Sequence, residues 1–434
     1  MSTTTSESRL IYKLPVEIWA EIFGSLFNYL SAQDDTGVGA IEDLGQFETK
    51  MPLFLRLGVE RTHLLLTCRY FRDILQPPRN QLTILEYRDG ESPAITVTTT
   101  QTGHSVYDTE RLEASAPIDH GSNTLGPVPW PPGWSTQSWQ SLKSLVLNSG
   151  FPFDPIPILS RAPNLRLLGC GLRTDRIDTG DMYPVLLHPQ LNQLTHLSLY
   201  PAKTLAINVP LPELTLPSLT VLQFELTMHD LYAPAPEELI PWTLPSLRTL
   251  ALRGKVDIVV CQQLQPFLDR HASIVINLAN DLTCWDHIRP LYLVILHFQQ
   301  LQVYSVEVGS ILGRGLHNIP STLPPQMHGE SPILLLTGIC DPCNIILKRS
   351  AFESTPSRII NKFRVLTRVM LDEPWQDIRV ALGRNQKHAI DFKTKITALL
   401  NGFQDLGAAV VDRHGVEMPR ATADWLDSGV GDQC

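Results

Sequence analysis

The sequence predicts an α/β protein with a short N-terminal helical domain, a central array of short repeated strands and a C-terminal helical region. Three observations predict it. Apolar residues recur at helical spacing near the N-terminus, short apolar runs between turn residues begin at Gln81, and one leucine motif recurs downstream. Because 434 residues exceed a typical domain of about 100–150 residues, we expect separate regions at 10–76, 81–345 and 346–434.

The N-terminal region contains two apolar segments that predict helices. Leu14–Leu30 has Pro15 in its first turn, where the missing N–H would have no partner within the helix. The second segment, Met51–Leu75, ends at the Pro77-Pro78 pair, which cannot continue a helix. Two helices are therefore expected in residues 10–76.

An acidic insertion, residues 31–49, separates these two segments. It has five acidic residues and no basic ones, which favours a surface loop. The alternative is a short helix that completes the domain core, since Ile41, Leu44 and Phe47 stand at i, i+3 and i+6.

The apolar face of Leu14–Leu30 is wider than one core contact needs. Two neighbouring stripes together cover about 180°, whereas a surface helix on one core needs only about 100°. Either a partner helix or the later helices of the same chain can cover the surplus. The stripes are Ile18, Ile22 and Leu26, and Trp19, Phe23, Phe27 and Leu30.

The central region contains five copies of Leu-x-x-Leu-x-Leu. They begin at Leu142, Leu165, Leu194, Leu219 and Leu247, with gaps of 23, 29, 25 and 28 residues. A period of about 20–29 residues is typical of leucine-rich repeats, in which each copy forms a short strand that no repeat can bury alone. We expect the variable positions of the strands, such as Lys143, Arg166, His196 and Arg248, to face outwards and choose the binding partner.

The rest of the central region and the C-terminal region are less regular. A Pro-rich insertion with two tryptophans at its end interrupts the array at 117–133. We expect helices at Gln262–His271, Thr355–Met370 and Phe392–Phe403, and strands at Ser273–Leu278, Leu301–Val308 and Ile333–Ile339.

Charge and cysteine content exclude several classes of protein. A net charge of −9 repels nucleic-acid backbones and anionic membrane surfaces, so neither is expected as a partner. Seven Cys residues, an odd number spread along the chain, do not suit a secreted disulfide framework. The N-terminus lacks the pattern of a signal peptide and no apolar run is long enough to span a bilayer. We expect a cytoplasmic protein, a nuclear protein, or both.

No motif in the sequence predicts catalysis, a metal site or a cofactor. Cys340 and Cys343 have C-x-x-C spacing, but no second ligand pair follows, although His317 and His328 stand upstream at unusual spacing. Two buried thiols at a turn are the favoured interpretation. The basic stretch Lys348–Arg368 fits a solvated helix face better than a nucleic-acid site.

Two N-terminal segments resemble the F-box family. Leu14, Pro15, Ile18, Ile22 and Phe23 match the opening of an F-box, and LLLTCRYFRDI, with Cys68 and Phe71, is similar to its closing helix. Here the acidic insertion lengthens the separation of the two halves, and Tyr70-Phe71 stands where the family commonly has Trp.

The F-box resemblance implies a function for the whole chain. F-box surfaces dock on a Skp-family adaptor, which joins a cullin scaffold, and leucine-rich repeats often supply the substrate arm. We therefore expect a substrate-recognition adaptor of a cullin-type ubiquitin ligase, without catalysis of its own, that brings an unknown protein target to ubiquitin-dependent degradation. The alternative is a leucine-rich-repeat scaffold without ligase association, and a more distant one is an enzyme.

Overall fold

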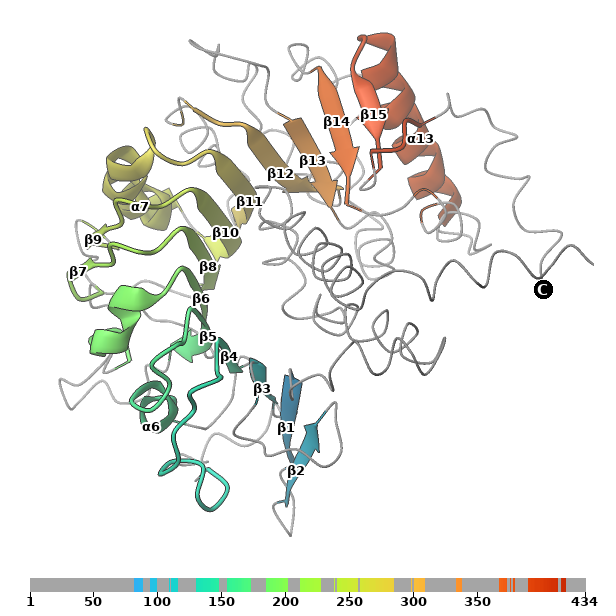
Figure 1. The fold of residues 1–434 in the computed structure, drawn as a ribbon. Coiled ribbons are helices and arrows are strands. Elements are labelled where there is room, and N and C mark those ends of the chain that lie inside the picture. The colour runs from blue at the N-terminus through green and yellow to red at the C-terminus, as the bar shows by residue number, and fades with distance from the viewer. Residues whose placement is uncertain are drawn as a thin grey trace, which may run out of the picture. The chain divides into compact units, whose positions relative to one another are not determined.

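The computed structural model describes residues 82–88, 94–99, 109, 111–115, 130–147, 154–172, 185–201, 211–227, 238, 240–256, 258–284, 298, 300–308, 333–337, 367–372, 375, 378, 389–412 and 415–418 (Figure 1). The chain divides into two compact units, Met1–Leu167 and Leu168–Cys434. The fold is α/β, with mostly parallel strands and few helices among the described residues.

Four of the described strands lie in the first unit, in the order β2-β1-β3-β4. Strands β1 and β2 pair antiparallel, whereas β1–β3 and β3–β4 pair parallel. The described elements of this unit are β1 (Leu82–Arg88), β2 (Ala94–Thr99), β3 (Arg111–Ser115), β4 (Ser144–Leu147) and α6 (Ile156–Leu159).

A tryptophan cluster spans the end of the Pro-rich insertion and the residues that follow it. The ring of Trp139 meets Trp134 edge to face at 5.3 Å, and Trp134 stacks on Trp130 at 6.2 Å. The indole of Trp139 donates to the carbonyl of Trp134, so this buried ring leaves no unpaired polar atom. The end of the Pro-rich insertion is thereby part of the core.

The second unit contains nine strands that lie side by side in chain order (Figure 1). Every register determined from β6 to β15 is parallel. The strands are β5 (Leu167–Leu172), β6 (His196–Pro201), β8 (Val221–Thr227), β10 (Thr249–Val256), β11 (Asn277–Cys284), β12 (Val303–Glu307), β13 (Ile333–Thr337), β14 (Arg368–Leu371) and β15 (Ala409–Val411). A separate parallel pair joins β7 (Leu214–Thr215) to β9 (Trp242–Thr243).

Each of the five leucine motifs begins a strand at its third residue, so the strand prediction is confirmed for all five. These third residues are Ser144, Leu167, His196, Val221 and Thr249. The first leucine of each motif ends a tight turn, in which its N–H donates to the carbonyl three residues earlier at 3.1–3.3 Å. Both ends of each turn are buried, which holds the turn against the core.

On one side of the second unit's strands, an apolar column runs in register from β6 to β15. Its members stand opposite one another in consecutive strands, all are buried, and we call them the leucine column: Leu197, Leu222, Leu250, Leu278, Tyr304, Leu334, Val369 and Val410. A single short strand leaves such a side chain exposed to water. Pairing the strands buries it, and each Å² of apolar surface buried stabilises the fold by about 25 cal/mol.

The two longer described helices of this unit are α7 (Ile258–His271) and α13 (Ala389–Asp405). The helix expected at Gln262–His271 is confirmed but starts four residues earlier and contains Pro266, whose interior position is offset by the burial of Leu264, Phe267 and Leu268.

The helix expected at Phe392–Phe403 is also confirmed, within α13. Its apolar face is buried as predicted, at Ile396, Leu399, Leu400 and Phe403. Gly407 adopts φ +85°, and the N–H groups of Gly407 and Ala408 donate to the carbonyls of Gln404 and Phe403. This Schellman motif ends the helix before β15. A short 3-10 helix, η3, spans Pro189–Gln193.

Three predicted boundaries change. The end of the helix predicted at Thr355–Met370 is wrong, because Arg368–Leu371 form strand β14 between β13 and β15. Val369 and Leu371 are both buried, and pairing on two sides outweighs the helical spacing of the apolar residues. The strands expected at Ser273–Leu278 and Leu301–Val308 are present but shifted, at Asn277–Cys284 and Val303–Glu307, whereas Ile333–Thr337 agrees.

Among the described residues, no helix combines the length and apolar character that crossing a bilayer requires.

The leucine column predicts that its truncation destabilises the array. Leu222→Ala removes a side chain with 0% exposure and should cost about 2–5 kcal/mol in the free energy of unfolding. Leu187→Ala is the matched control, since that leucine is 65% exposed and its truncation should cost no more than about 0.5 kcal/mol. Urea denaturation of both variants measures the difference, and equal effects would contradict the role of the column.

Candidate binding surface of the sheet

The residues predicted to contact a Skp-family adaptor all lie outside the described residues. They are Leu14, Pro15, Ile18, Ile22, Phe23, Cys68 and Phe71. Cys340 and Cys343 lie outside them as well. The adaptor surface and the C-x-x-C pair therefore stay predictions, and the described site is on the sheet.

The four variable residues proposed as contacts lie at the starts of strands. Lys143, Arg166 and Arg248 are exposed, and His196, the first residue of β6, is partly exposed. His196 Nδ1 lies 2.8 Å from Thr195 Oγ1, so the imidazole is held by its own neighbour. Lys143 and Arg166 belong to the first unit and His196 and Arg248 to the second, so each pair forms part of its own unit's surface.

The backbone at these strand starts forms a repeated hydrogen-bond pattern. At five strand starts, the carbonyl just before the strand accepts two N–H groups from the start of the next strand in the sheet. Thr195 accepts from Thr220 and Val221, both at 2.9 Å, and Thr220 accepts from Arg248 and Thr249 at 2.8 and 2.9 Å. Lys143, Arg248 and Ile276 accept in the same way. These hydrogen bonds fix the spacing between the strand-start residues of neighbouring strands, and so the spacing of their side chains.

The side of the sheet opposite the leucine column carries mostly small and polar residues at its centre. In register from β6 to β12 these are Ser198, Gln223, Ala251, Ala279 and Ser305, which we call the small-residue row. All five are buried. The four variable positions named from the sequence are exposed or partly exposed at the strand starts, whereas the members of the row, inside the strands, are buried. A sequence feature marks the row, because the fifth motif position holds Val146, Gly169, Ser198, Gln223 and Ala251 rather than leucine.

Two members of the row lack hydrogen bonds. Gln223 is 0% exposed and neither its Oε1 nor its Nε2 has a partner, and Ser198 Oγ, on the adjacent strand, has none either. Nearby, Asn277 Nδ2 donates to Thr249 Oγ1 at 3.1 Å, so the polar pair beside the row is satisfied. Buried polar groups are nearly always paired, which makes the Gln223 amide the unusual group on this surface.

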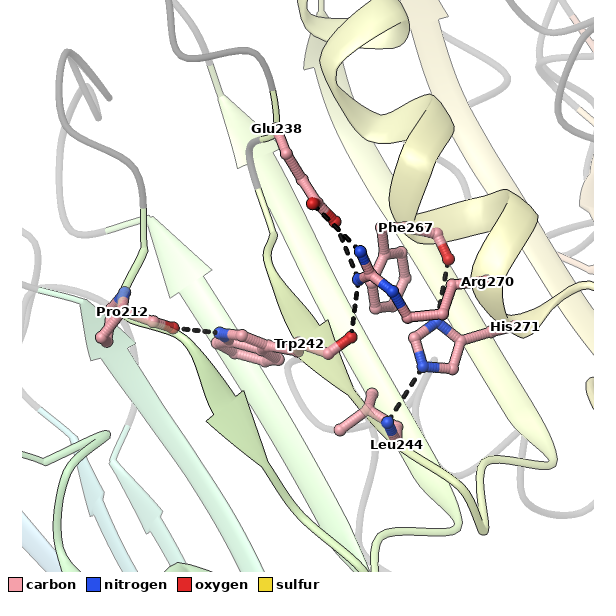
Figure 2. Close-up of polar contacts among 7 residues, drawn as sticks. All are labelled: Pro212, Glu238, Trp242, Leu244, Phe267, Arg270 and His271. Carbon is pink, nitrogen blue, oxygen red and sulfur yellow. Dashed lines mark hydrogen bonds and ion pairs between the residues drawn. The ribbon is translucent and has the colours of Figure 1, made fainter.

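On the other side of the sheet, a polar network ties α7 to β9 (Figure 2). The N–H of Leu244 donates to His271 Nε2 at 3.0 Å, and His271 Nδ1 lies 2.8 Å from the carbonyl of Phe267. Since a carbonyl only accepts, Nδ1 carries the proton and His271 is neutral. Burial lowers the pKa of His271 from its ordinary value of 6.5, against a smaller upward effect of the Phe267 hydrogen bond.

Arg270 and Trp242 extend this network to the preceding repeat (Figure 2). Arg270 Nη1 donates to the carbonyl of Trp242 at 2.9 Å, and Nη2 donates to Glu238 Oε2 at 3.0 Å. The indole of Trp242 donates to the carbonyl of Pro212 at 3.1 Å and its ring meets Phe224 edge to face at 6.2 Å. Both ring nitrogens of His271 are occupied by backbone groups, so the network is structural rather than catalytic.

The thiol of Cys170 is buried within the sheet. Burial raises the pKa of the Cys170 thiol to about 12, which keeps it protonated and unreactive at neutral pH. Within the described ranges no group of three or more His, Cys, Asp or Glu residues is placed to hold a metal ion.

Comparison of the chain with family models, with curated proteins and with solved structures gives no match in any of the three.

The His271 network predicts a pH-dependent contribution to stability. Because the pKa is lower in the folded protein than in the unfolded chain, the unfolded chain binds more protons below about pH 6.5. The contribution of His271 is therefore complete above that pH and is lost as the pH falls towards the folded pKa. His271→Gln, which keeps one acceptor, should lower the melting temperature most at about pH 7.5 and least at about pH 5. A pH-independent difference between the two proteins would contradict this assignment.

Proposed function

We propose that this protein is the substrate-recognition subunit of a cullin-type ubiquitin ligase. Its 10–76 region would act as the F-box that docks on a Skp-family adaptor, and its central strands would form a leucine-rich-repeat solenoid that binds the target protein. The observation that carries the repeat part of the proposal is the coincidence of five leucine motifs with five strand starts. The N-terminal part is supported by the spacing of Leu14, Pro15 and Ile18 and of Cys68 and Phe71.

The proposed mechanism is proximity. A target held on the repeats and an enzyme held through the cullin scaffold meet at a raised effective concentration, so no catalytic side chain is required of this chain. The backbone hydrogen bonds at the strand starts support this role, because they hold the exposed side chains at fixed intervals along the sheet. Arg248 is one such side chain in the second unit.

The proposed specificity lies in the contrast between the two sides of the sheet. The leucine column admits only apolar residues, since a polar substitution there would be buried without a partner. The strand starts are free of that constraint, because side chains such as Arg248 are exposed there. Target choice would therefore depend on exposed residues such as Arg248, while the architecture depends on the column.

The proposal predicts that Ile18→Asp combined with Phe23→Asp abolishes adaptor binding and leaves the repeats folded. Two carboxylates at an apolar interface cost several kcal/mol, enough to remove a micromolar contact of about 8 kcal/mol from detection. The measurement is co-purification of a Skp-family adaptor with the full chain, with circular dichroism as the folding check.

Arg248→Asp in the exposed strand start is the matched control, because it changes charge far along the sequence from the predicted F-box. Retained adaptor binding in the double variant would reject the F-box assignment. No adaptor binding by the wild-type chain would leave the scaffold alternative, a leucine-rich-repeat protein without ligase association.

A further inference from the structure

Strand β2 has a partner on only one of its two edges in the part of the chain that the structure describes. It pairs antiparallel with β1 from Ala94 to Thr99, and of the described strands only β1 pairs with it (Figure 1). Val97, near the middle of β2, stands opposite Leu85, which is fully buried, yet Val97 is 41% exposed. The buried core of these strands therefore ends at an edge where an apolar side chain is open to solvent.

The sequence of β2 lacks the features that usually protect an edge strand. Charged residues, Pro and bulges are the common ones. Residues Ala94–Thr99 include no charged residue and no Pro, and their register with β1 is continuous, without a bulge. The free edge of these six residues is about 20 Å long at ~3.4 Å per residue. Its outward N–H and C=O groups are a template for another strand.

Strand β15 of the second unit shows how this chain covers an edge elsewhere. After β15 the chain turns back, and Val411 pairs with Glu417 in an antiparallel bridge. The N–H of Met418 then donates to the carbonyl of Val410 at 2.8 Å. No equivalent cover of β2 is found among the described residues.

We propose that β2 is the contact for a second copy of this chain, with the two β2 strands paired antiparallel about a two-fold axis. The sheet would continue from one copy into the other. Such a contact closes on itself, because each β2 edge is used by the other copy, and it gives a dimer rather than a fibre. This inference is independent of the proposed function.

The register of β2 favours a second copy as the occupant of this edge. A two-fold axis at Val97 places it opposite Val97 of the second copy, and residues that are opposite in an antiparallel pair share one side of the sheet. Leu85 and Val97 of one copy would therefore align with Val97 and Leu85 of the other, and the apolar core would continue across the axis. Every position of Ala94–Thr99 then meets an uncharged one, so no charge is desolvated.

The small size of the contact sets the expected strength of the dimer. A contact confined to two six-residue strands falls in the class below ~1,200 Å² of buried surface, in which complexes are weak or transient. We expect a dimer that forms at about 10–100 µM and dissociates on dilution.

The test is sedimentation of the full chain in an analytical ultracentrifuge at about 1–100 µM. Val97→Lys and Val97→Glu each place like charges directly opposite one another at the axis, and each should weaken the dimer at least about tenfold. Leu187→Lys is the matched control, because Leu187 is 65% exposed and lies in the second unit, and it should dimerise as wild type does. An equimolar mixture of Val97→Lys and Val97→Glu should restore the dimer, which a folding defect could not do.

A cysteine at the axis gives a second, independent measurement. The Cα atoms of opposite residues in an antiparallel pair are about 4.5–5.5 Å apart, within the range of a disulfide. Val97→Cys should therefore form a disulfide-linked dimer under mild oxidation, seen by non-reducing electrophoresis. Wild type and Leu187→Cys, oxidised in the same way, give the background from the other cysteines. If a charged variant fails to fold, as judged by circular dichroism, the cysteine variant decides the question.

Four results overturn the proposal. They are a wild-type chain that stays monomeric up to about 100 µM, a dimer that both Val97 charge variants retain, no recovery when the two variants are mixed, and no cross-link above background at Val97→Cys. A monomeric wild type leaves the edge for a strand of another protein. Neither assay contains an adaptor, so failure here with retained adaptor co-purification leaves the ligase proposal standing.

Discussion

The shared carbonyl at each strand start is the contact on which the rest of the sheet depends. Thr195, Thr220, Arg248 and Ile276 each accept two N–H groups from the following repeat, so the position of one strand sets the position of the next. In a parallel sheet a slip of one residue moves every side chain to the opposite side. The repeated double acceptance fixes the register, and through it the separation of the leucine column from the small-residue row.

A similar turn precedes the strands of the leucine motifs. This explains how connections of different lengths can lead into strands that keep the same register. Leu216 and Leu219, like Leu244 and Leu247, are buried at the two ends of a turn closed by one backbone hydrogen bond. The chain therefore enters each strand from the same point in the core, whether β7, β9 or a helix precedes it. One of these turns is also held by a helix. The imidazole of His271 in α7 accepts the N–H of Leu244, which ties the turn before β10 to α7.

Sequence patterns predicted the parts of the fold that local chemistry determines. The leucine motifs located five strand starts, and the spacing of Ile396, Leu399, Leu400 and Phe403 located α13. Patterns failed where pairing between distant strands decides the outcome. Arg368–Leu371 suits a helix by spacing, yet β13 and β15 pair with it on both edges. The burial of Ser198 and Gln223 was also missed, because a polar residue at a variable position gives no sign in the sequence of what covers it. The predicted F-box residues lie outside the described part of the chain and stay predictions.

The two sides of the sheet have different residue compositions, and this difference bears on the stability of the strands. A cavity in the leucine column is expected to destabilise neighbouring strands, because each inner member stands in register between two others. A change in the small-residue row leaves the leucine column intact. Unpaired polar groups in the row can therefore be tolerated, because their cost of a few kcal/mol is offset by burial of the column. An amide such as that of Gln223 is then tolerated without a partner in the free chain. The unpaired amide costs about 1–3 kcal/mol, which is of the same size as the stabilisation from burying one large apolar side chain of the column on the opposite side of the same strands.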